Sequence, residues 1–132
     1  ELHDIGKLVI HETILNKKEK LDPGEWEILK EHPVTGEKIL KPVLDEELLH
    51  VIRSHHERVD GKGYPDGLKD GEINMPSQIV SVADAYDAMT SLRSYREPLT
   101  SGDAVSEIKR ASGTQFRPEV VKAFLKVIGR TA

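Results

Sequence analysis

Apolar and polar positions follow a helical period along almost the whole chain. Within residues 77–92, apolar side chains recur every three or four positions: Ile79, Val82, Ala83, Tyr86 and Met89. The same period predicts helices over residues 23–32, 33–40, 46–56, 102–111 and 118–128. Residues 60–71 are expected to be a loop, and residues 71–76 a brief extended segment. The sequence therefore predicts an all-α fold with one compact helical domain over residues 1–132.

Residues that begin and end helices support these boundaries. Three side chains are predicted to act as helix caps: Asp22, Asp45 and Ser101. The first is followed by Pro23, which suits a first turn, and by Glu25, a carboxylate three residues after the cap. Pro33 is expected to stop or redirect this helix just after His32.

Composition and charge exclude several classes of protein. The 132 residues suit a single domain. A formal net charge of −4 gives no general attraction to DNA or to anionic membranes, so an anionic ligand needs a local cationic site. The lack of cysteine excludes disulfides, thiolate zinc sites and a cysteine nucleophile, and fits a cytoplasmic location. No apolar run reaches the roughly 18 residues of a membrane span.

Two histidine-containing clusters interrupt the apolar pattern. In HDIGK, residues 3–7, helical geometry can bring His3, Asp4 and Lys7 toward one point, where they suit a metal and a bound phosphate. His55 and His56 are adjacent at a predicted helix end. Successive helical positions are about 100° apart, so the two rings do not easily serve one metal. We expect them to serve two adjacent metals, or one to ligate while the other orients it.

A third cluster contains Asp84 and Asp87, three residues apart on one helix face. Alanines flank Asp84, and a buried carboxylate without a partner is costly. Each cluster also has a plainer explanation: a surface dipeptide, a solvated helix end, or a salt-bridged core acid. The ordered combination of HDxxK, His32, HH and Asp84 is hard to attribute to accident, and it favours a metal site.

That combination resembles the HD-GYP family, a branch of the HD-domain metal-dependent phosphohydrolases, along essentially the whole chain. HDIGK is similar to the HD motif with its lysine, and EHPVTGEKIL to the next conserved block. HHERVDGKGYPDGL is similar to the HHExxDGxGYP signature, and IVSVADAYDAMTSLRSYR to the last motif. An HD pair alone would be a weak signal, whereas the long GYP signature is very specific. The resemblance implies a compact helical HD-domain-like bundle.

The resemblance also implies roles for individual residues. The metal ligands would be His3, Asp4, His32, His55, His56 and Asp84. Asp4 would bridge two ions and Lys7 would contact the scissile phosphate or the attacking hydroxide, which makes these two the expected catalytic residues. Arg93 and Arg96 match positions that hold substrate phosphates. Four loop residues would contribute to contacts with diguanylate cyclase domains, unless the turn is purely structural: Gly61, Gly63, Tyr64 and Pro65.

Family members hydrolyse cyclic di-GMP to linear pGpG, and some continue to GMP, in bacterial second-messenger signalling. They use two or three divalent metals, usually iron or manganese, and many are attached to receiver or sensor domains of response regulators and sensor proteins. Oxygen and imidazole ligands suit these metals, and paired metals suit in-line displacement at phosphorus. We therefore expect a metal-dependent cyclic di-GMP phosphodiesterase. The alternatives are an HD-type phosphohydrolase of another nucleotide, or a non-catalytic module that binds cyclic dinucleotides or a partner.

Two features depart from the family pattern. Family members carry a further histidine, and in some cases a glutamate, on a helix before the HD motif. This sequence opens directly on the motif without an initiator methionine, so we expect the upstream helices to be absent and one metal to lack a protein ligand. Arg117 stands where the family commonly has an aspartate that caps the last helix, and loss of such a cap costs about 1 kcal/mol.

Overall fold

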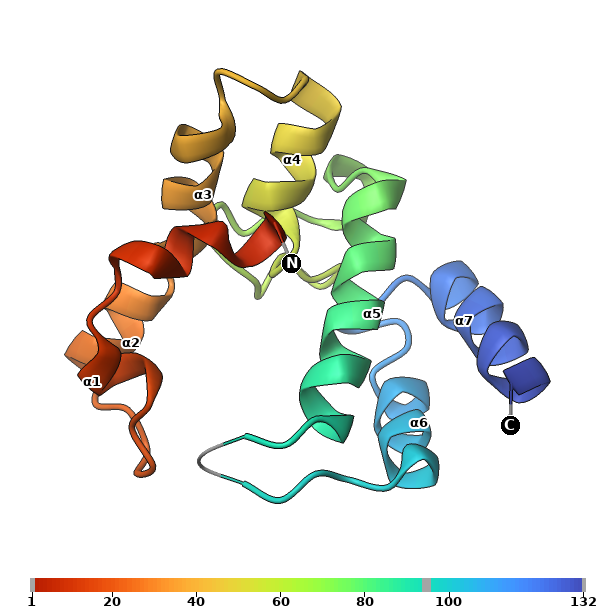
Figure 1. Ribbon diagram of the computed structural model, residues 1–132. Coiled ribbons are helices and arrows are strands. Elements are labelled where there is room, and N and C mark those ends of the chain that lie inside the picture. Colours follow the sequence, from red (N-terminus) through yellow and green to blue (C-terminus); the bar gives the residue numbers. More distant parts are fainter. Residues whose placement is uncertain (1, 94–95, 132) are drawn as a thin grey trace.

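The computed structural model describes residues 2–93 and 96–131, whose regular elements are helices joined by loops (Figure 1). In chain order the elements are η1 (Leu2–Val9), α1 (Glu12–Leu15), α2 (Pro23–Leu29), α3 (His32–Leu40), α4 (Glu46–Ser54), η2 (Asp70–Glu72), α5 (Met75–Thr90), α6 (Ser101–Arg110) and α7 (Pro118–Thr131), where η1 and η2 are 3₁₀ helices. The all-α prediction is confirmed. None of the described helices combines the length and the apolar character that crossing a membrane requires.

The 3₁₀ helix η1 packs against α3 and α4 and closes the first of two hydrophobic clusters. This cluster contains Leu40, Leu49 and Ile52, with Ile5 of η1 packed against it. Gly6 permits the close approach of η1 to α3, because a Cβ atom there would overlap the carbonyl oxygen of His32. The HDIGK segment is thus fixed against the start of α3 by its backbone.

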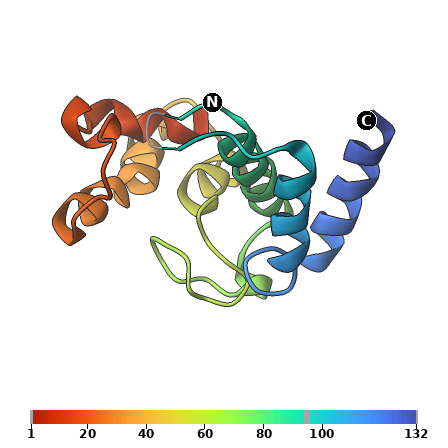
Figure 2. The same cartoon turned by 90° about the horizontal axis from the view of Figure 1, so that it is seen from below.

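The long helix α5 connects the two halves of the molecule, as both views show (Figures 1 and 2). On one side it contacts α4, and on the other it packs with α6 and α7. The second hydrophobic cluster lies there and is built from Val82, Ile108, Phe116, Val120 and Val121. Asp84, two residues beyond Val82 on α5, faces away from this core toward η1, where its carboxylate meets His3.

Most predicted boundaries hold, and three are corrected by the structure. Asp22 forms the predicted capping box, but α2 ends at Leu29, and Pro33 lies in the first turn of α3 instead of stopping α2 at His32. The cap of α6 is Thr100, because its hydroxyl accepts from the Asp103 amide. Within residues 71–76 only Ile73 and Asn74 are extended: Glu72 ends η2, and Met75 begins α5 behind its cap Asn74.

Candidate metal centre and adjoining cavity

All six residues predicted as metal ligands lie together at the meeting point of η1, α3, α4 and α5. Their nitrogen and oxygen atoms form two groups in which every pair is within 4.8 Å. One group contains Asp4, His32, His55 and His56; the other contains His3, His55 and Asp84. His55 belongs to both groups, so the two groups have one residue in common.

Asp4 lies at the centre of this arrangement. Its Oδ1 is 3.3 Å from Nε2 of His32 and 3.5 Å from Nε2 of His55, and its Oδ2 is 3.3 Å from Nε2 of His3. His3 also reaches Oδ1 of Asp84 at 3.1 Å. The Asp4 carboxylate thus faces imidazoles from both groups.

The backbone fixes which ring nitrogen of His32 and His55 faces the centre. Nδ1 of His32 is 2.7 Å from the Leu29 carbonyl oxygen, and Nδ1 of His55 is 2.8 Å from the Ile52 carbonyl oxygen. A carbonyl oxygen only accepts, so each Nδ1 carries the proton and each Nε2 presents a lone pair. Hydrogen bonding of the distal nitrogen is the usual support of a metal-bound histidine.

The inner atoms of this cluster are buried polar atoms in need of a partner. Oδ1 of Asp4 and Nε2 of His32, His55 and His56 are shielded from solvent and make no hydrogen bond within the described residues. Buried polar atoms are nearly always satisfied. Here lone pairs of a carboxylate and of imidazoles face one another, and a cation between them would satisfy all of them. The residues present therefore fit a divalent metal site.

The expectation that His55 and His56 do not easily serve one metal assumed that both lie in a helix. Helix α4 ends at Ser54, so His55 is its C-cap and His56 already lies in the following turn. The 100° rotation of a helix does not apply between them. Their ring centroids are 4.2 Å apart, and both rings belong to one ligand group.

The cluster shifts the protonation equilibria of its members. Hydrogen bonds to Asp4 and then to Asp84 raise the pKa of His3 to about 9. Burial would raise the pKa of Asp4, but the hydrogen bond from His3 and the positive charge of Lys7 outweigh this and hold the pKa far below its usual range. Burial, with the neighbouring imidazoles His55 and His32, lowers the pKa of His56 to about 3. An ionised carboxylate and a neutral imidazole are the forms that bind metals, so Asp4 and His56 are already in these forms, whereas His3 would release a proton on binding a metal.

The GYP turn packs onto the cluster from outside. The Tyr64 ring stacks on His56 with centroids 4.9 Å apart and an interplanar angle of 15°. Gly63 leaves room for this turn, because a Cβ there would lie 2.5 Å from the His56 carbonyl oxygen. Gly61 has φ of +79°, which suits glycine, and the Tyr64–Pro65 peptide is cis. The tyrosine ring thus supports a candidate ligand.

Two charged residues that the sequence analysis did not single out hold this turn in place. Glu57 is 3% exposed, and its carboxylate accepts from the backbone amides of Asp66 (2.7 Å) and Leu68 (2.9 Å). Arg53 connects the turn to α3 through Asp66 (2.7 Å) and Glu37 (2.6 Å). The sequence did contain a signal for Glu57, because this residue directly follows the two histidines in the GYP signature. The sequence analysis used that signature only to identify metal ligands and loop residues.

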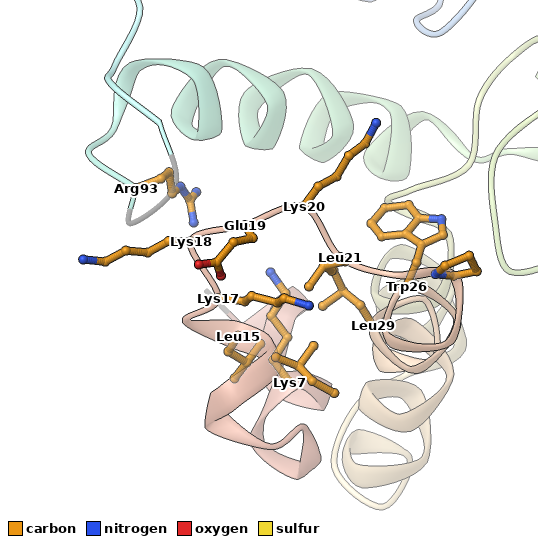
Figure 3. A pocket seen from close by; sticks show the side chains of 12 residues that line it. Lys7, Leu15, Lys17, Lys18, Glu19, Lys20, Leu21, Trp26, Leu29 and Arg93 are labelled. Carbon is orange, nitrogen blue, oxygen red and sulfur yellow. The ribbon is translucent and has the colours of Figure 1, made fainter.

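A cavity of about 850 Å³ adjoins the cluster (Figure 3). Lys7 belongs to both: it lines the cavity, and its Nζ is 3.5 Å from Oδ1 of Asp4. Arg93, predicted to bind substrate phosphate, also lines the cavity. Arg96 is exposed, donates to the Ala88 carbonyl at 3.1 Å and lies outside the lining. The structure therefore brings Lys7 and Arg93 to one cavity but not Arg96.

Trp26 of α2 lies on the wall of this cavity and belongs to neither hydrophobic cluster. Its indole is 42% exposed and lines the cavity together with Leu21 and Leu29. It meets the Tyr64 ring edge-on at 6.1 Å. No local pattern distinguishes a tryptophan on a cavity wall from one in a core.

Arg117 has a structural role of its own at the start of α7. Its Nε is 2.7 Å from Oδ1 of Asp70, and its Nη2 donates to the carbonyl oxygens of Asp70 (2.9 Å) and Ile73 (3.2 Å). The arginine therefore ties the beginning of α7 to η2, an interaction that an aspartate cap at this position would not make.

Comparisons with known proteins agree with this geometry. A family model described as HD domain matches residues 1–120. The chain is 47% identical over 130 residues to a cyclic di-GMP phosphodiesterase of Thermotoga maritima, covering 96% of this chain and 35% of that protein. It is 37% identical to the 3'3'-cGAMP-specific phosphodiesterase 2 of Vibrio cholerae, covering 95% of this chain and 24% of that protein. The chain thus spans about a third or less of these relatives.

A solved structure confirms the fold. Bd1817, an HDG"Y"P protein from Bdellovibrio bacteriovorus, superposes with a TM-score of 0.73 at 18% identity, over 96% of this chain and 40% of that one.

Proposed function

Because the chain belongs to the HD domain family and carries the HD-GYP signature, we propose that it hydrolyses cyclic di-GMP to linear pGpG with divalent metal ions, with GMP as an alternative end product. The observation that carries this proposal is the convergence of six metal-ligating side chains beside a cavity that contains Lys7 and Arg93.

The proposed metal site uses residues from four elements. Asp4, His32, His55 and His56 would hold one ion, and His3, His55 and Asp84 would take part in a second, with Asp4 between them. Nitrogen and oxygen donors without thiolate favour iron or manganese. When bound, such ions lower the pKa of water and stabilise charge on phosphoryl oxygens. We propose that two or three such ions bind.

The remaining chemistry belongs to the side chains themselves. Lys7 lies between the cluster and the cavity, so its ammonium would neutralise a phosphate oxygen of the scissile diester. The guanidinium of Arg93 would bind a phosphate in the same cavity, since it offers permanent charge and paired donors. Arg96 as a phosphate ligand, loop contacts with diguanylate cyclase domains, and an attached receiver or sensor domain stay predictions.

The test measures metal content and turnover on the same preparations. Protein loaded with manganese or iron should convert cyclic di-GMP to pGpG, and metal removal by a chelator should abolish this. His55→Ala should lose most bound metal and activity, because His55 belongs to both ligand groups. A matched control is His11→Asn, at an exposed helix cap outside the cluster, which keeps a capping side chain. Turnover by His55→Ala equal to that of the unmodified protein would refute the metal-site proposal.

A second substrate is 3'3'-cGAMP, because a relative at 37% identity is specific for it by name. A panel containing cyclic di-GMP, 3'3'-cGAMP and mononucleotides, compared by kcat/KM, separates this possibility from the leading one. Binding of a cyclic dinucleotide by metal-loaded protein without any turnover would instead support a non-catalytic module.

A further inference from the structure

We propose that Trp26 is a base-stacking residue, and that the cavity wall around it is a nucleobase subsite for the substrate. This inference rests on the proposed function, because it assigns part of the cavity next to the candidate metal centre to a nucleotide. It concerns a residue outside the HD and GYP motifs.

The Trp26 indole contacts Tyr64, and part of its surface stays exposed. Trp26 is 42% exposed at the cavity, although large aromatic side chains normally gain by burial. Its contact with Tyr64 is edge-to-face, with an interplanar angle of 77°. No ring stacks face to face on Trp26 in the part of the chain that the structure describes. Leu21 and Leu29 line the cavity on the same side, as Figure 3 shows, and complete an apolar wall.

Charge at the cavity is opposite to that of the whole chain. The described lining residues include one carboxylate, Glu19, and five cations: Lys7, Lys17, Lys18, Lys20 and Arg93. Yet the chain has a net charge of −4. Lys17 keeps its position through an ion pair with Glu25 at 2.7 Å. A cavity with this surplus of cations attracts an anionic ligand.

The aromatic and cationic parts lie in one order relative to the candidate metal centre. In Figure 3, Trp26 lies at one end of the cavity and Arg93 at the other, with Lys7 and Lys17 between them. Lys7 contacts Asp4 of the candidate metal centre. Trp26 contacts Tyr64, which in turn stacks on His56 of the same centre. A phosphate near Lys7 would therefore place an attached planar group within the same cavity as the indole.

A nucleotide combines the two chemistries that this cavity requires. Its phosphate is an anion for the lysines and Arg93, and its base offers a π-face for the indole. Stacking of a base on an aromatic side chain contributes about 1–3 kcal/mol, which corresponds to roughly 5- to 150-fold in affinity. An aliphatic phosphate ester would gain the charge contacts only.

Trp26 itself supplies the readout, because it is the sole tryptophan of the sequence. Chelator-treated protein, which cannot turn substrate over, is titrated with cyclic di-GMP, with GMP and with ribose 5-phosphate while indole fluorescence is recorded. We expect saturable quenching by cyclic di-GMP and GMP, and none by ribose 5-phosphate at equal concentration. Equal quenching by GMP and ribose 5-phosphate, or calorimetric binding of GMP with unchanged fluorescence, would overturn the proposal.

Variants give a second, independent measurement by calorimetry. Trp26→Leu should bind GMP roughly 5- to 150-fold more weakly, whereas Trp26→Phe, which keeps a ring, should lose much less. Ile28→Ala is the matched control: it lies on the same helix, is 45% exposed and does not line the cavity. Unchanged affinity in a folded Trp26→Leu protein would overturn the stacking role.

The two proposals fail in distinguishable ways. If metal-loaded protein hydrolyses cyclic di-GMP while Trp26 neither responds to GMP nor matters for its affinity, only the base subsite is wrong. If no phosphodiester is hydrolysed but GMP quenches the indole and ribose 5-phosphate does not, the proposed activity is wrong and the subsite stands.

Discussion

Gly6 offers a sharp test of how the HDIGK segment is positioned. A Cβ at this residue would lie 2.8 Å from the Gly36 nitrogen and 2.8 Å from the His32 carbonyl carbon, and it would overlap the His32 carbonyl oxygen. These are backbone atoms of α3, so no side chain can move aside. The Gly6→Ala protein has to separate η1 from α3.

The size of the effect follows from the required displacement. Ordinary contacts begin at about 3.4 Å, so η1 must move by roughly 0.6 Å at the Gly36 nitrogen and by more at the His32 oxygen. Overpacking a close contact costs typically 1–3 kcal/mol, and a clash with fixed backbone belongs at the upper end. We therefore expect Gly6→Ala to lower the free energy of unfolding by about 3 kcal/mol. It should also weaken manganese binding, because Asp4 and His32 move apart.

The assay is urea denaturation followed by circular dichroism, with manganese affinity measured by calorimetry. The matched control is Gly102→Ala, within α6, where a Cβ meets nothing within 4 Å. Replacing an unhindered helical glycine should stabilise the protein by about 0.5–1 kcal/mol. A Gly6→Ala protein within about 0.5 kcal/mol of the unmodified one, with unchanged manganese affinity, would refute the close approach of η1 to α3.

Three further predictions concern charged or titratable side chains. Glu57→Gln places an amide group against one of two backbone donors, so it should lower the free energy of unfolding by about 2–3 kcal/mol. It should also speed tryptic cleavage of the GYP turn, and an unchanged cleavage rate would contradict this. Arg117→Asp should destabilise the protein by about 1–2 kcal/mol in urea denaturation although it adds a cap, since it loses the bonds to η2 and faces Asp70; a gain in stability would show that the cap dominates. In chelator-treated protein, the raised pKa of His3 should stabilise the fold fully below pH 6.5, and this stabilisation should be lost as the pH rises to about 9. His3→Asn should remove this decline in the free energy of unfolding. Parallel pH profiles of stability for both proteins would exclude the assignment.

The sequence by itself determined the helices and the identity of the candidate ligands. Period and caps are local signals, so α4 behind Asp45 and the capping box of Asp22 were predictable from a few neighbouring residues. The six candidate ligands were recognisable through the resemblance to the HD-GYP family, whose motifs fix their order along the chain. The helix ends at Leu29 and Thr100 were missed, since helical propensity changes little over two or three residues.

Only the tertiary structure decided how these residues meet. That α4 ends at Ser54 and frees His56 from the helical rotation depends on the path of the GYP turn, which Glu57 and Arg53 hold through contacts 9 to 16 residues away in sequence. The position of Trp26 on a cavity wall depends on where Tyr64 and Lys7 lie. Helical period reports which face of a segment is apolar, but burial of that face is a property of the neighbouring elements. The convergence of imidazoles, carboxylates and lysines was therefore predictable in kind from the sequence, while its geometry belongs to the packing of η1, α3, α4 and α5.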